Sequence, residues 1–531
     1  MDLLASKKLL HKRIEMDVRS LLIIDKLFSN KFYLYLLLTV SGILSALSLP
    51  PCFYIFFNFL AFPILFYFTI TSANKVKAFF IGWWFGFGYF LLGLYWFAHA
   101  LLIDSEKFAW LIPFANLGIP SLLAIYIGLT TCCFYTISKL IPRITIIGQL
   151  ITFGTIWMIF EWLRGHLFTG FPWNLIGYSF ANITSILQLT SIFGIYGLSF
   201  FTIVLSTSPI MLLEHKKHYY KFISLCTIGL IIFYTGNQRL TLHYTQFNDS
   251  IPVRIVQANI PQDLKWQQNI LLDNMMRHMQ LSQSNQTNIK IKYIIWPESA
   301  IPYPINNDSL LQLLSSAIPS DGLLLTGSIR VIRQNKKQKW WNSISAINSE
   351  GHIVGYYDKT HLVPFGEYVP FRSILPIEKI AYGLSDWEHG NGQSTLYLVD
   401  ELPPVSPLVC YEVIFPHEVT DNTHKAEWLL NVTNDGWYGQ SFGPYQHFYT
   451  ALVRAVEEGI PLVRAANTGI SAVIDSYGRI ISKLDLGAQG VLDSLLPLPA
   501  HSVTIYSKYG DITLILFLLF NILYLLCIKN K

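Results

Sequence analysis

One cysteine of this 531-residue chain stands apart from the others. Cys410 directly follows the short apolar run Val405–Val409, and a strand that ends in a thiol fixes a nucleophile on rigid structure. The remaining cysteines all fall in long apolar segments, at positions 52, 132, 133, 226 and 527. Cys410 is therefore the only thiol of the more polar C-terminal half, which favours a reactive thiol; a buried structural cysteine is the alternative.

Two other reactive side chains share this position near the end of a predicted strand. Glu298 comes two residues after the run Tyr293–Trp296, and Lys359 comes two residues after the run Ile353–Tyr357. Functional groups of α/β sheets gather at strand ends, so the three side chains can converge although they are far apart in sequence. Taken singly, the glutamate could be a turn residue and the lysine a surface charge.

A glutamate, a lysine and a cysteine together can carry out acyl transfer. The carboxylate takes the thiol proton, the thiolate attacks an acyl carbon, and the lysine donates to the oxyanion that develops. The usual pKa values of cysteine and glutamate differ by roughly 4 units, or about 6 kcal/mol, which opposes this proton transfer. We expect burial to raise the pKa of Glu298 and the nearby Lys359 to lower the pKa of Cys410.

The C-terminal half alternates short strands with helices, which predicts an α/β layered domain with helices on the sheet faces. Glu350 and Gly351 are expected to form the turn of a hairpin. Strands are predicted at residues 253–258, 293–296, 323–328, 344–348, 353–357, 405–409, 428–432 and 471–474, and helices at 269–282 and 445–458.

The N-terminal half carries too little charge for a soluble domain. Residues 32–236 contain nine Lys or Arg and four Asp or Glu in 205 positions, so this part is predicted to lie in a bilayer. We expect a polytopic α-helical membrane domain of about eight transmembrane helices. The apolar runs lie near residues 32–49, 52–70, 78–100, 110–137, 145–162, 186–213, 220–236 and 511–528.

Basic residues gather in alternate loops, which are expected to face the cytoplasm. They are Lys75, Lys77, Lys139, Arg143, Lys216, Lys217 and Lys221, whereas the other short loops hold only Lys107 and Arg164. This pattern places the catalytic domain on the far side of the membrane. The predicted order is a cytoplasmic basic lead (1–31), a transmembrane domain (32–236), the catalytic domain (237–510), a C-terminal transmembrane helix (511–528) and a cytoplasmic tail (529–531).

One loop on the far side, residues 161–174, mixes glycine, proline and aromatic residues with the pair Glu161 and Arg164. An aromatic belt at the membrane surface would explain this composition. A lipid or acyl-chain site is the alternative.

Signatures of other chemistries are missing from the sequence. It has no Gly-x-Ser-x-Gly, His-Glu-x-x-His, Cys-x-x-Cys or phosphate-binding glycine loop. His417 and Glu418 lack a third ligand at useful spacing, so we expect no metal and no cofactor. The net charge of +5 is small and does not favour nucleic acid as a partner.

Four motifs go beyond generic chemistry, namely Trp296–Ala300, Lys359–Pro370, Cys410–Glu412 and Asn434–Gly439. Together they resemble the apolipoprotein N-acyltransferases, the membrane-anchored branch of the nitrilase, or carbon-nitrogen hydrolase, superfamily. The second motif is highly specific to that branch. The loop Arg164–Trp173, with its Gly-Phe-Pro-Trp run, also resembles the family's membrane half, so the resemblance covers the chain from about Lys31 to its end.

The resemblance implies a nitrilase-like αββα sandwich and the last step of bacterial lipoprotein maturation. An acyl chain would pass from a phospholipid, typically phosphatidylethanolamine, to the nucleophile Cys410 as a thioester. It would then pass to the N-terminal amine of a diacylglyceryl-cysteine apolipoprotein, with Glu298 as general base and Lys359 as oxyanion lysine. The resemblance also implies a multi-pass protein of the bacterial inner membrane with its catalytic domain in the periplasm, and we expect a monomer.

Supporting roles follow from the same motifs. Glu367 would orient Lys359 or assist proton transfer, and Tyr411 and Glu412 would support the site. Trp266 matches a family tryptophan near the lipid entrance.

Two other functions stay open from the residues alone. A membrane-tethered amidase would use the same three side chains, with water in place of the lipoprotein amine. A lipid transporter with an accessory binding domain is the second alternative, and the scarcity of polar groups in the spans argues against it.

Overall fold

The computed structural model describes residues 30–214, 219–284, 289–334, 337–374, 378–381, 385–421 and 423–529. The predicted basic lead lies outside the described residues except for its last two positions, and so do Lys216, Lys217 and the end of the predicted tail. The described chain forms two compact units. The first comprises residues 30–97, 111–242 and 509–529, and the second comprises residues 98–110 and 243–508, apart from the gaps given above.

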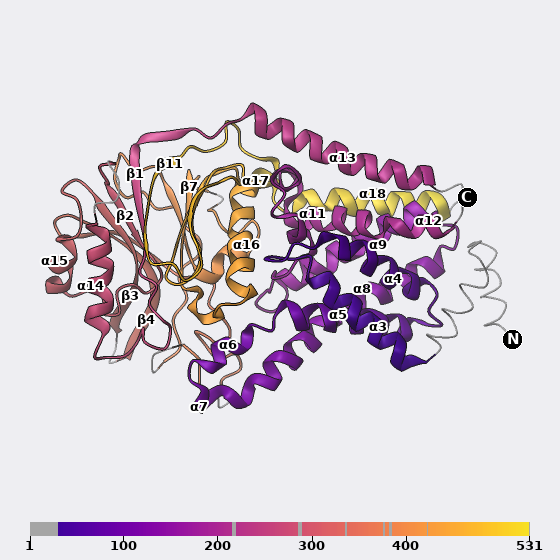
Figure 1. Cartoon of the computed structure of the whole chain (residues 1–531), viewed down its shortest axis with the longest axis horizontal. Helices are drawn as coiled ribbons and strands as arrows, with labels where there is room; N and C mark the ends of the chain where they lie inside the picture. Colours follow the sequence, from indigo (N-terminus) through magenta and orange to yellow (C-terminus); the bar gives the residue numbers. More distant parts are fainter. Residues whose placement is uncertain are drawn as a thin grey trace. The chain divides into compact units, whose positions relative to one another are not determined.

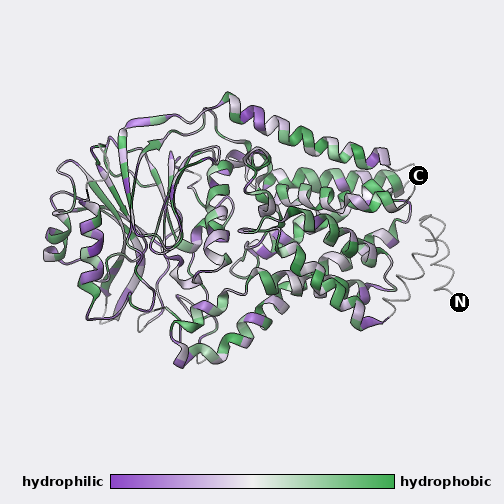
Figure 2. Ribbon diagram, viewed as in Figure 1, coloured by the Kyte–Doolittle hydropathy of each residue, from purple (hydrophilic) through white to green (hydrophobic). Residues whose placement is uncertain are grey.

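The first unit is helical, and Figure 2 shows that its helices are hydrophobic over most of their length. Five helical segments of the described chain are long and apolar enough to cross a membrane, and three further apolar helices are shorter. These helices coincide with the eight apolar runs of the sequence and fit a membrane domain. The main helices are α3 (Lys31–Ala46), α4 (Asn58–Ile70), α5 (Lys75–Gly93), α8 (Ile119–Leu140), α9 (Ile146–His166), α11 (Thr190–Thr207), α13 (Tyr219–Leu242) and α18 (Ile512–Lys529).

Close helix packing in this unit depends on small residues. Gly42 of α3 lies against α5 so tightly that a Cβ atom would stand 2.0 Å from the carbonyl oxygen of Phe85. Only glycine fits at such a distance, and small residues are the usual means by which membrane helices approach one another. A larger residue at position 42 would force α3 and α5 apart.

The loop predicted at residues 161–174 is partly helical, since Glu161 and Arg164 lie in the last turns of α9 and are buried. Arg164, counted above as a loop charge, donates from Nη1 to the carbonyl oxygens of Phe171 (2.7 Å) and Trp173 (2.6 Å). Glu161 accepts from the backbone N–H of Ile176 at 2.9 Å. The two charged residues therefore hold the following loop against α9.

The second unit contains two sheets with helices outside them (Figure 1). The six-stranded sheet has the order β11-β1-β2-β3-β4-β5, and the five-stranded sheet has the order β10-β9-β8-β7-β6. The strands are β1 (Phe247–Gln257), β2 (Tyr293–Trp296), β3 (Leu323–Gln334), β4 (Lys337–Asn348), β5 (Ile353–Asp358), β6 (Val405–Val409), β7 (Trp428–Thr433), β8 (Leu462–Ala466), β9 (Ser471–Ile474), β10 (Ile480–Leu484) and β11 (Gly490–Pro497). Short helices α6 (Phe97–Leu102) and α7 (Ser105–Phe108) precede them in the chain.

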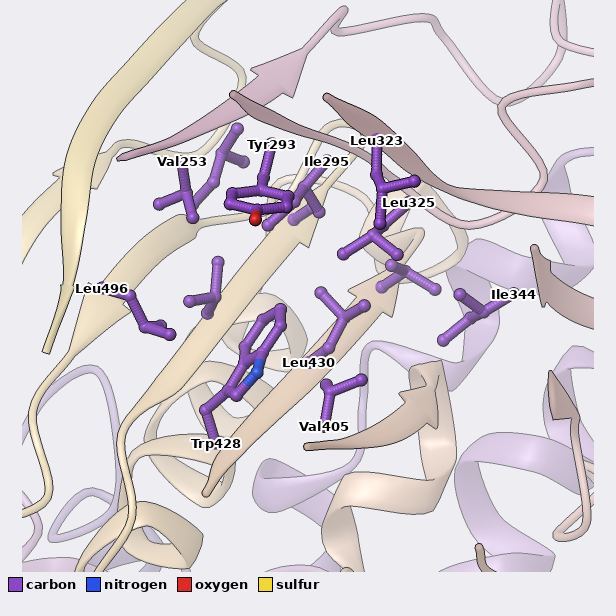
Figure 3. Close-up of a cluster of buried hydrophobic side chains, with 14 of the residues drawn as sticks. Val253, Tyr293, Ile295, Leu323, Leu325, Ile344, Val405, Trp428, Leu430 and Leu496 are labelled. Atoms are coloured by element: carbon purple, nitrogen blue, oxygen red, sulfur yellow. The ribbon is translucent and has the colours of Figure 1, made fainter. Parts of the chain in front are cut away.

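The core of this unit lies between the two sheets. Figure 3 shows side chains of both sheets meeting there, among them Tyr293 and Ile295 from β2 and Trp428 and Leu430 from β7. On the outer face of the six-stranded sheet, α14 (Leu271–Ser282) and α15 (Asp308–Ser315) bury a second apolar cluster. Helix α16 (Phe442–Glu458) lies on the side of the five-stranded sheet away from β1–β4 (Figure 1). The predicted αββα sandwich is thus confirmed.

All eight predicted strands are present, and both predicted helices correspond to α14 and α16. The turn before β5 is also confirmed, with Gly351 at a φ of +79°. Strands β8, β10 and β11 were not predicted. The predicted start of β4, residue 344, lies seven residues after its start in the structure. The residues in between pair with β3, but their sequence shows no strand alternation of its own.

Candidate active site

Cys410 lies at the point where β6 ends and a short 3-10 helix, η7 (Cys410–Ile414), begins. Its φ is +53°, a left-handed conformation that costs a non-glycine residue energy and persists only when its surroundings hold it. His447 Nε2 lies 3.1 Å from the Cys410 carbonyl oxygen, and Asn431 Nδ2 donates to the same oxygen at 3.5 Å. The thiol is thus presented on a turn that neighbouring strands and α16 hold in place.

Glu298 follows β2 and is 6% exposed. Its Oε1 accepts a hydrogen bond of 2.8 Å from Asn342 Nδ2, whereas Oε2 has no hydrogen-bond partner among the described residues. Strand β3 passes very close to this turn, because a Cβ on Gly327 would stand 2.5 Å from the Glu298 Cα. One carboxylate oxygen is therefore oriented and the other is open to accept a proton.

Lys359 follows β5 and is 1% exposed. Its Nζ forms an ion pair of 2.8 Å with Glu367 Oε2, and its backbone N–H donates to the Asn342 carbonyl oxygen at 2.9 Å. Glu367 in turn accepts from Asn342 Nδ2 (3.0 Å) and from the backbone N–H of Val363 (2.8 Å). The arrangement agrees with the predicted orienting role of Glu367.

Burial and mutual interaction set the charges of the three groups. Burial, reinforced by Glu298, raises the pKa of the Cys410 thiol to about 12, although Lys359 acts in the opposite direction. Our expectation of a lowered thiol pKa was therefore wrong, because the cost of burying the thiolate exceeds the attraction of Lys359. Burial also raises the pKa of Glu298, as expected. Burial opposes the charge on Lys359, but Glu367 and Glu298 outweigh it and hold the pKa of that lysine above its usual value.

These directions describe a resting site with a neutral thiol, a permanently charged lysine and a carboxylate more basic than usual. A thiol with so high a pKa is neutral at neutral pH, so we expect it to lose its proton as it attacks, with Glu298 accepting that proton in the same step. Such a site activates its nucleophile in contact with substrate and keeps it unreactive otherwise.

Glu412 connects the Cys410 turn to the segment that carries Lys359. Its Oε2 accepts from the backbone N–H of Val409 at 2.7 Å. Its Oε1 accepts from the backbone N–H groups of Thr360 (2.6 Å) and His361 (3.1 Å) and from the hydroxyl of Tyr357 (2.8 Å). A single buried carboxylate thus joins the two segments, which fits a supporting role.

Glu412→Gln should weaken this connection, since one amide can present an oxygen to only one of the two segments. A backbone N–H would then face the amide NH₂ in a buried position, at a cost of about 1–3 kcal/mol. We expect a lower melting temperature and slower acylation of Cys410, measured by mass spectrometry of the purified protein. Glu418→Gln is the matched control, because Glu418 Oε2 also contacts His361, at 3.4 Å, but is largely exposed. Equal acylation rates in the two variants would contradict this role of Glu412.

Tyr411 and Trp266, the other two predicted residues, lie in different settings. Tyr411 is 6% exposed, its ring packs edge-on against Phe415 at 5.2 Å, and burial raises its pKa. Trp266 is half-buried in the turn of residues 262–266. Next to it, Lys265 is buried and donates from Nζ to the Glu298 carbonyl oxygen at 2.8 Å.

No role was predicted from the sequence for three sets of site residues. They are Asn342, Lys265 and a buried group below the Cys410 turn. In that group His447 Nδ1 lies 2.8 Å from Asp435 Oδ1, and Arg464 Nη2 donates to Asp435 Oδ2 at 2.8 Å. Burial opposes the charge on Asp435, yet Arg464 and His447 bring its pKa down to about 2. Asp435 belongs to a motif noted in the sequence, but nothing there indicated its partners.

The described residues contain no group of three His, Cys, Asp or Glu that could hold a metal ion. The polar groups that do converge are the Cys410 thiol, the carboxylates of Glu298 and Glu367, and the amino groups of Lys265 and Lys359. This set is suited to moving an acyl group onto sulfur and off again, with a base, a nucleophile and an oxyanion donor all on ordered elements.

Comparison with known proteins gives consistent results for both units. The family described as Apolipoprotein N-acyltransferase N-terminal domain matches residues 41–208, and the family described as Carbon-nitrogen hydrolase matches residues 252–503. The second match agrees with the sandwich fold of the second unit.

Similar proteins that match over most of their length come from several bacteria. The apolipoprotein N-acyltransferase of Rhodopseudomonas palustris is 38% identical over 500 residues, which cover 89% of this chain and 91% of that protein. The enzyme of the same name from Rickettsia bellii is 41% identical, with 91% of this chain and 96% of that protein covered. Among solved structures, a nitrilase-superfamily member of branch 10 from Saccharomyces cerevisiae matches with 17% identity and a TM-score of 0.35, covering 49% of this chain and 94% of its own.

Proposed function

Since this chain belongs to the apolipoprotein N-acyltransferase family, we propose that it transfers an acyl chain from a phospholipid to the N-terminal amine of an apolipoprotein. The amine is that of a diacylglyceryl-cysteine, and the donor is phosphatidylethanolamine. The reaction completes lipoprotein maturation. One observation carries the proposal: the Cys410 thiol interacts electrostatically with both the open carboxylate of Glu298 and the charged Lys359, within one buried site.

In the first half-reaction, Glu298 Oε2 accepts the proton of Cys410 as the sulfur attacks an ester carbonyl carbon of the phospholipid. Lys359 Nζ donates a hydrogen bond to the oxyanion that forms on that carbon. The ester C–O bond then breaks, and Glu298 returns the proton to the departing lysophospholipid oxygen. The product is a thioester on Cys410, with no net uptake or release of protons.

In the second half-reaction, the lipoprotein amine attacks the thioester carbonyl carbon and the C–S bond breaks. A proton from the amine returns to the sulfur of Cys410 through Glu298, and Lys359 again faces the oxyanion. Water must stay away from the thioester for transfer to exceed hydrolysis, and the burial of all three side chains supports this requirement.

The membrane unit suits the substrates. Both are lipids, and a polytopic helical domain holds a catalytic domain at the bilayer more firmly than a lipid anchor would. We propose a monomer in the bacterial inner membrane, with the second unit on the periplasmic side and with Trp266 close to the path of the lipid.

A lipopeptide assay tests the function directly. The full-length protein is reconstituted with phosphatidylethanolamine and a diacylated lipopeptide that begins with cysteine, and the products are followed by mass spectrometry. We expect one additional acyl group on the lipopeptide amine and an equal amount of lysophospholipid. Release of free fatty acid with an unmodified amine would instead identify an amidase, and movement of lipid without any covalent product would identify a transporter.

A further inference from the structure

Lys265 is a second lysine of the active site that the proposed mechanism does not use. It is 5% exposed, and its Nζ donates to the carbonyl oxygen of Glu298, the general base, at 2.8 Å. Within the described part of the chain, this is the only hydrogen bond of the Lys265 side chain. It also interacts electrostatically with the Glu298 carboxylate and with the Cys410 thiol. Lys265 therefore lies among the reacting groups and has donor capacity left over.

The two lysines of the site differ in the partners that they have. Lys359 forms an ion pair with Glu367, and this pairing holds its charge at all physiological pH values. Lys265 forms no ion pair with a described carboxylate within 4.0 Å, and burial lowers its pKa to about 8. Lys359 is thus suited to a fixed positive charge, whereas Lys265 can gain and lose a proton near neutral pH.

The second half-reaction needs such a group. An α-amino group has an ordinary pKa of about 7.7–8.0, so at neutral pH the acceptor arrives mostly as an ammonium ion without a lone pair. The overall step is R–NH₃⁺ plus thioester giving amide, Cys410 thiol and one H⁺. Glu298 carries the proton that reaches sulfur, and the other proton needs a separate acceptor.

We propose that Lys265, in its neutral form, accepts the proton that the incoming α-ammonium group loses before it attacks the Cys410 thioester. The N–H bond of the ammonium breaks, its electron pair becomes the nucleophilic lone pair, and the proton binds Lys265 Nζ. Lys265 returns to its neutral form by passing that proton to water after the product leaves. The proposal rests on the proposed acyl transfer and assigns its second half-reaction a further catalytic residue.

A purely structural role makes different predictions. If Lys265 served only as a cation that holds Glu298, arginine would replace it, since a guanidinium keeps the charge and the donors but does not release its proton. The experiment therefore compares Lys265→Arg with Lys265→Met in the full-length protein. Both half-reactions are measured separately: acylation of Cys410 by phospholipid, then discharge of the isolated thioester to lipopeptide.

We expect acylation within about threefold of wild type for Lys265→Arg, because no ammonium group loses a proton in that step. Discharge to lipopeptide at about pH 7 should be at least about tenfold slower in both variants. The difference should shrink to about threefold or less near pH 9.5, where the lipopeptide amine is already neutral. Hydroxylamine, an acceptor that is uncharged at neutral pH, should discharge all three proteins at similar rates.

Several results would overturn the proposal. They are wild-type discharge by Lys265→Arg at about pH 7, a discharge defect that does not change with pH, an equal defect toward hydroxylamine, or an acyl group found on Lys265 itself. Failure of wild-type Cys410 to acquire an acyl group would instead refute the proposed function. If neither variant folds, Lys265→Gln takes their place with the same expected results, since its amide keeps a donor for the Glu298 carbonyl oxygen but accepts no proton.

Discussion

Cys410→Ala should abolish acyl transfer while leaving the protein folded in the membrane. The substitution removes one sulfur atom from a buried turn, together with its hydrogen bond to the Thr433 side chain, so we expect only a small change in melting temperature. Loss of a covalent nucleophile typically lowers the rate by at least about 10⁴-fold, because neither half-reaction has an alternative path. The measurement is N-acylation of the diacylated lipopeptide in reconstituted membranes.

The matched control for this variant is Cys226→Ala. Cys226 lies in α13 and is exposed, and the structure gives it no part in the site. It should transfer acyl groups at the wild-type rate. If Cys410→Ala retained more than about 1% of wild-type transfer, a covalent route through this thiol would be wrong.

Glu298→Gln should slow the acylation of Cys410 by about 10²–10⁴-fold, the range for loss of a general base. The amide has the same shape as the carboxylate but cannot accept the thiol proton. Because burial raises the pKa of the thiol to about 12, almost no thiolate exists at neutral pH to react without a base. Acylation by this variant should therefore rise steadily as the pH increases, since hydroxide then generates the thiolate.

The activity of the wild type should change at acidic pH, whereas that of the Glu298→Gln variant should change at alkaline pH. The ionised form of Glu298 is the active base, and burial raises its pKa, so activity is lost as the pH falls through a value above the usual glutamate range. Glu350→Gln, at the exposed hairpin turn before β5, is the control and should match the wild type at every pH. A Glu298→Gln variant with the acidic limb of the wild type would assign the base to another residue.

The positions of Glu298, Lys359 and Cys410 were accessible from the sequence because each follows a short run with strand composition. Strand ends meet at the edges of a sheet, so equivalent positions in three strands predict one site even when the strand order is unknown. The alternation of strands and helices predicted an α/β layered domain, and the resemblance to the family implied the sandwich fold. The membrane unit followed from the scarcity of charge, which no soluble domain tolerates.

The supporting residues were harder to predict, because their roles depend on strand register. Asn342 lies in the middle of β4, where it pairs with Ile329 of β3, while the next residue, Ser343, pairs with Asp358 of β5. This register brings Asn342 beside both Glu298 and Glu367, and no local pattern encodes it. No role was predicted for Lys265, because only the packed structure shows that its side chain is buried against Glu298.

The expected effect of Lys359 on Cys410 failed for a related reason. Sequence indicates which charges come near a thiol but not how deeply the thiol is buried, and burial here is the larger effect. The same depth explains the missed β8, whose central Arg464 is fully buried although an arginine usually indicates a surface. Buried polar networks of this kind become visible only when the packing is known.

The acyl-enzyme itself provides the most direct test of the mechanism. The full-length protein is incubated with phosphatidylethanolamine in the absence of lipopeptide, digested, and analysed by mass spectrometry for acyl groups. We predict one acyl chain on the peptide that contains Cys410, removable by neutral hydroxylamine and discharged when lipopeptide is added. A preparation that acylates lipopeptide yet never carries an acyl group on Cys410, or carries it on another residue, would contradict the mechanism.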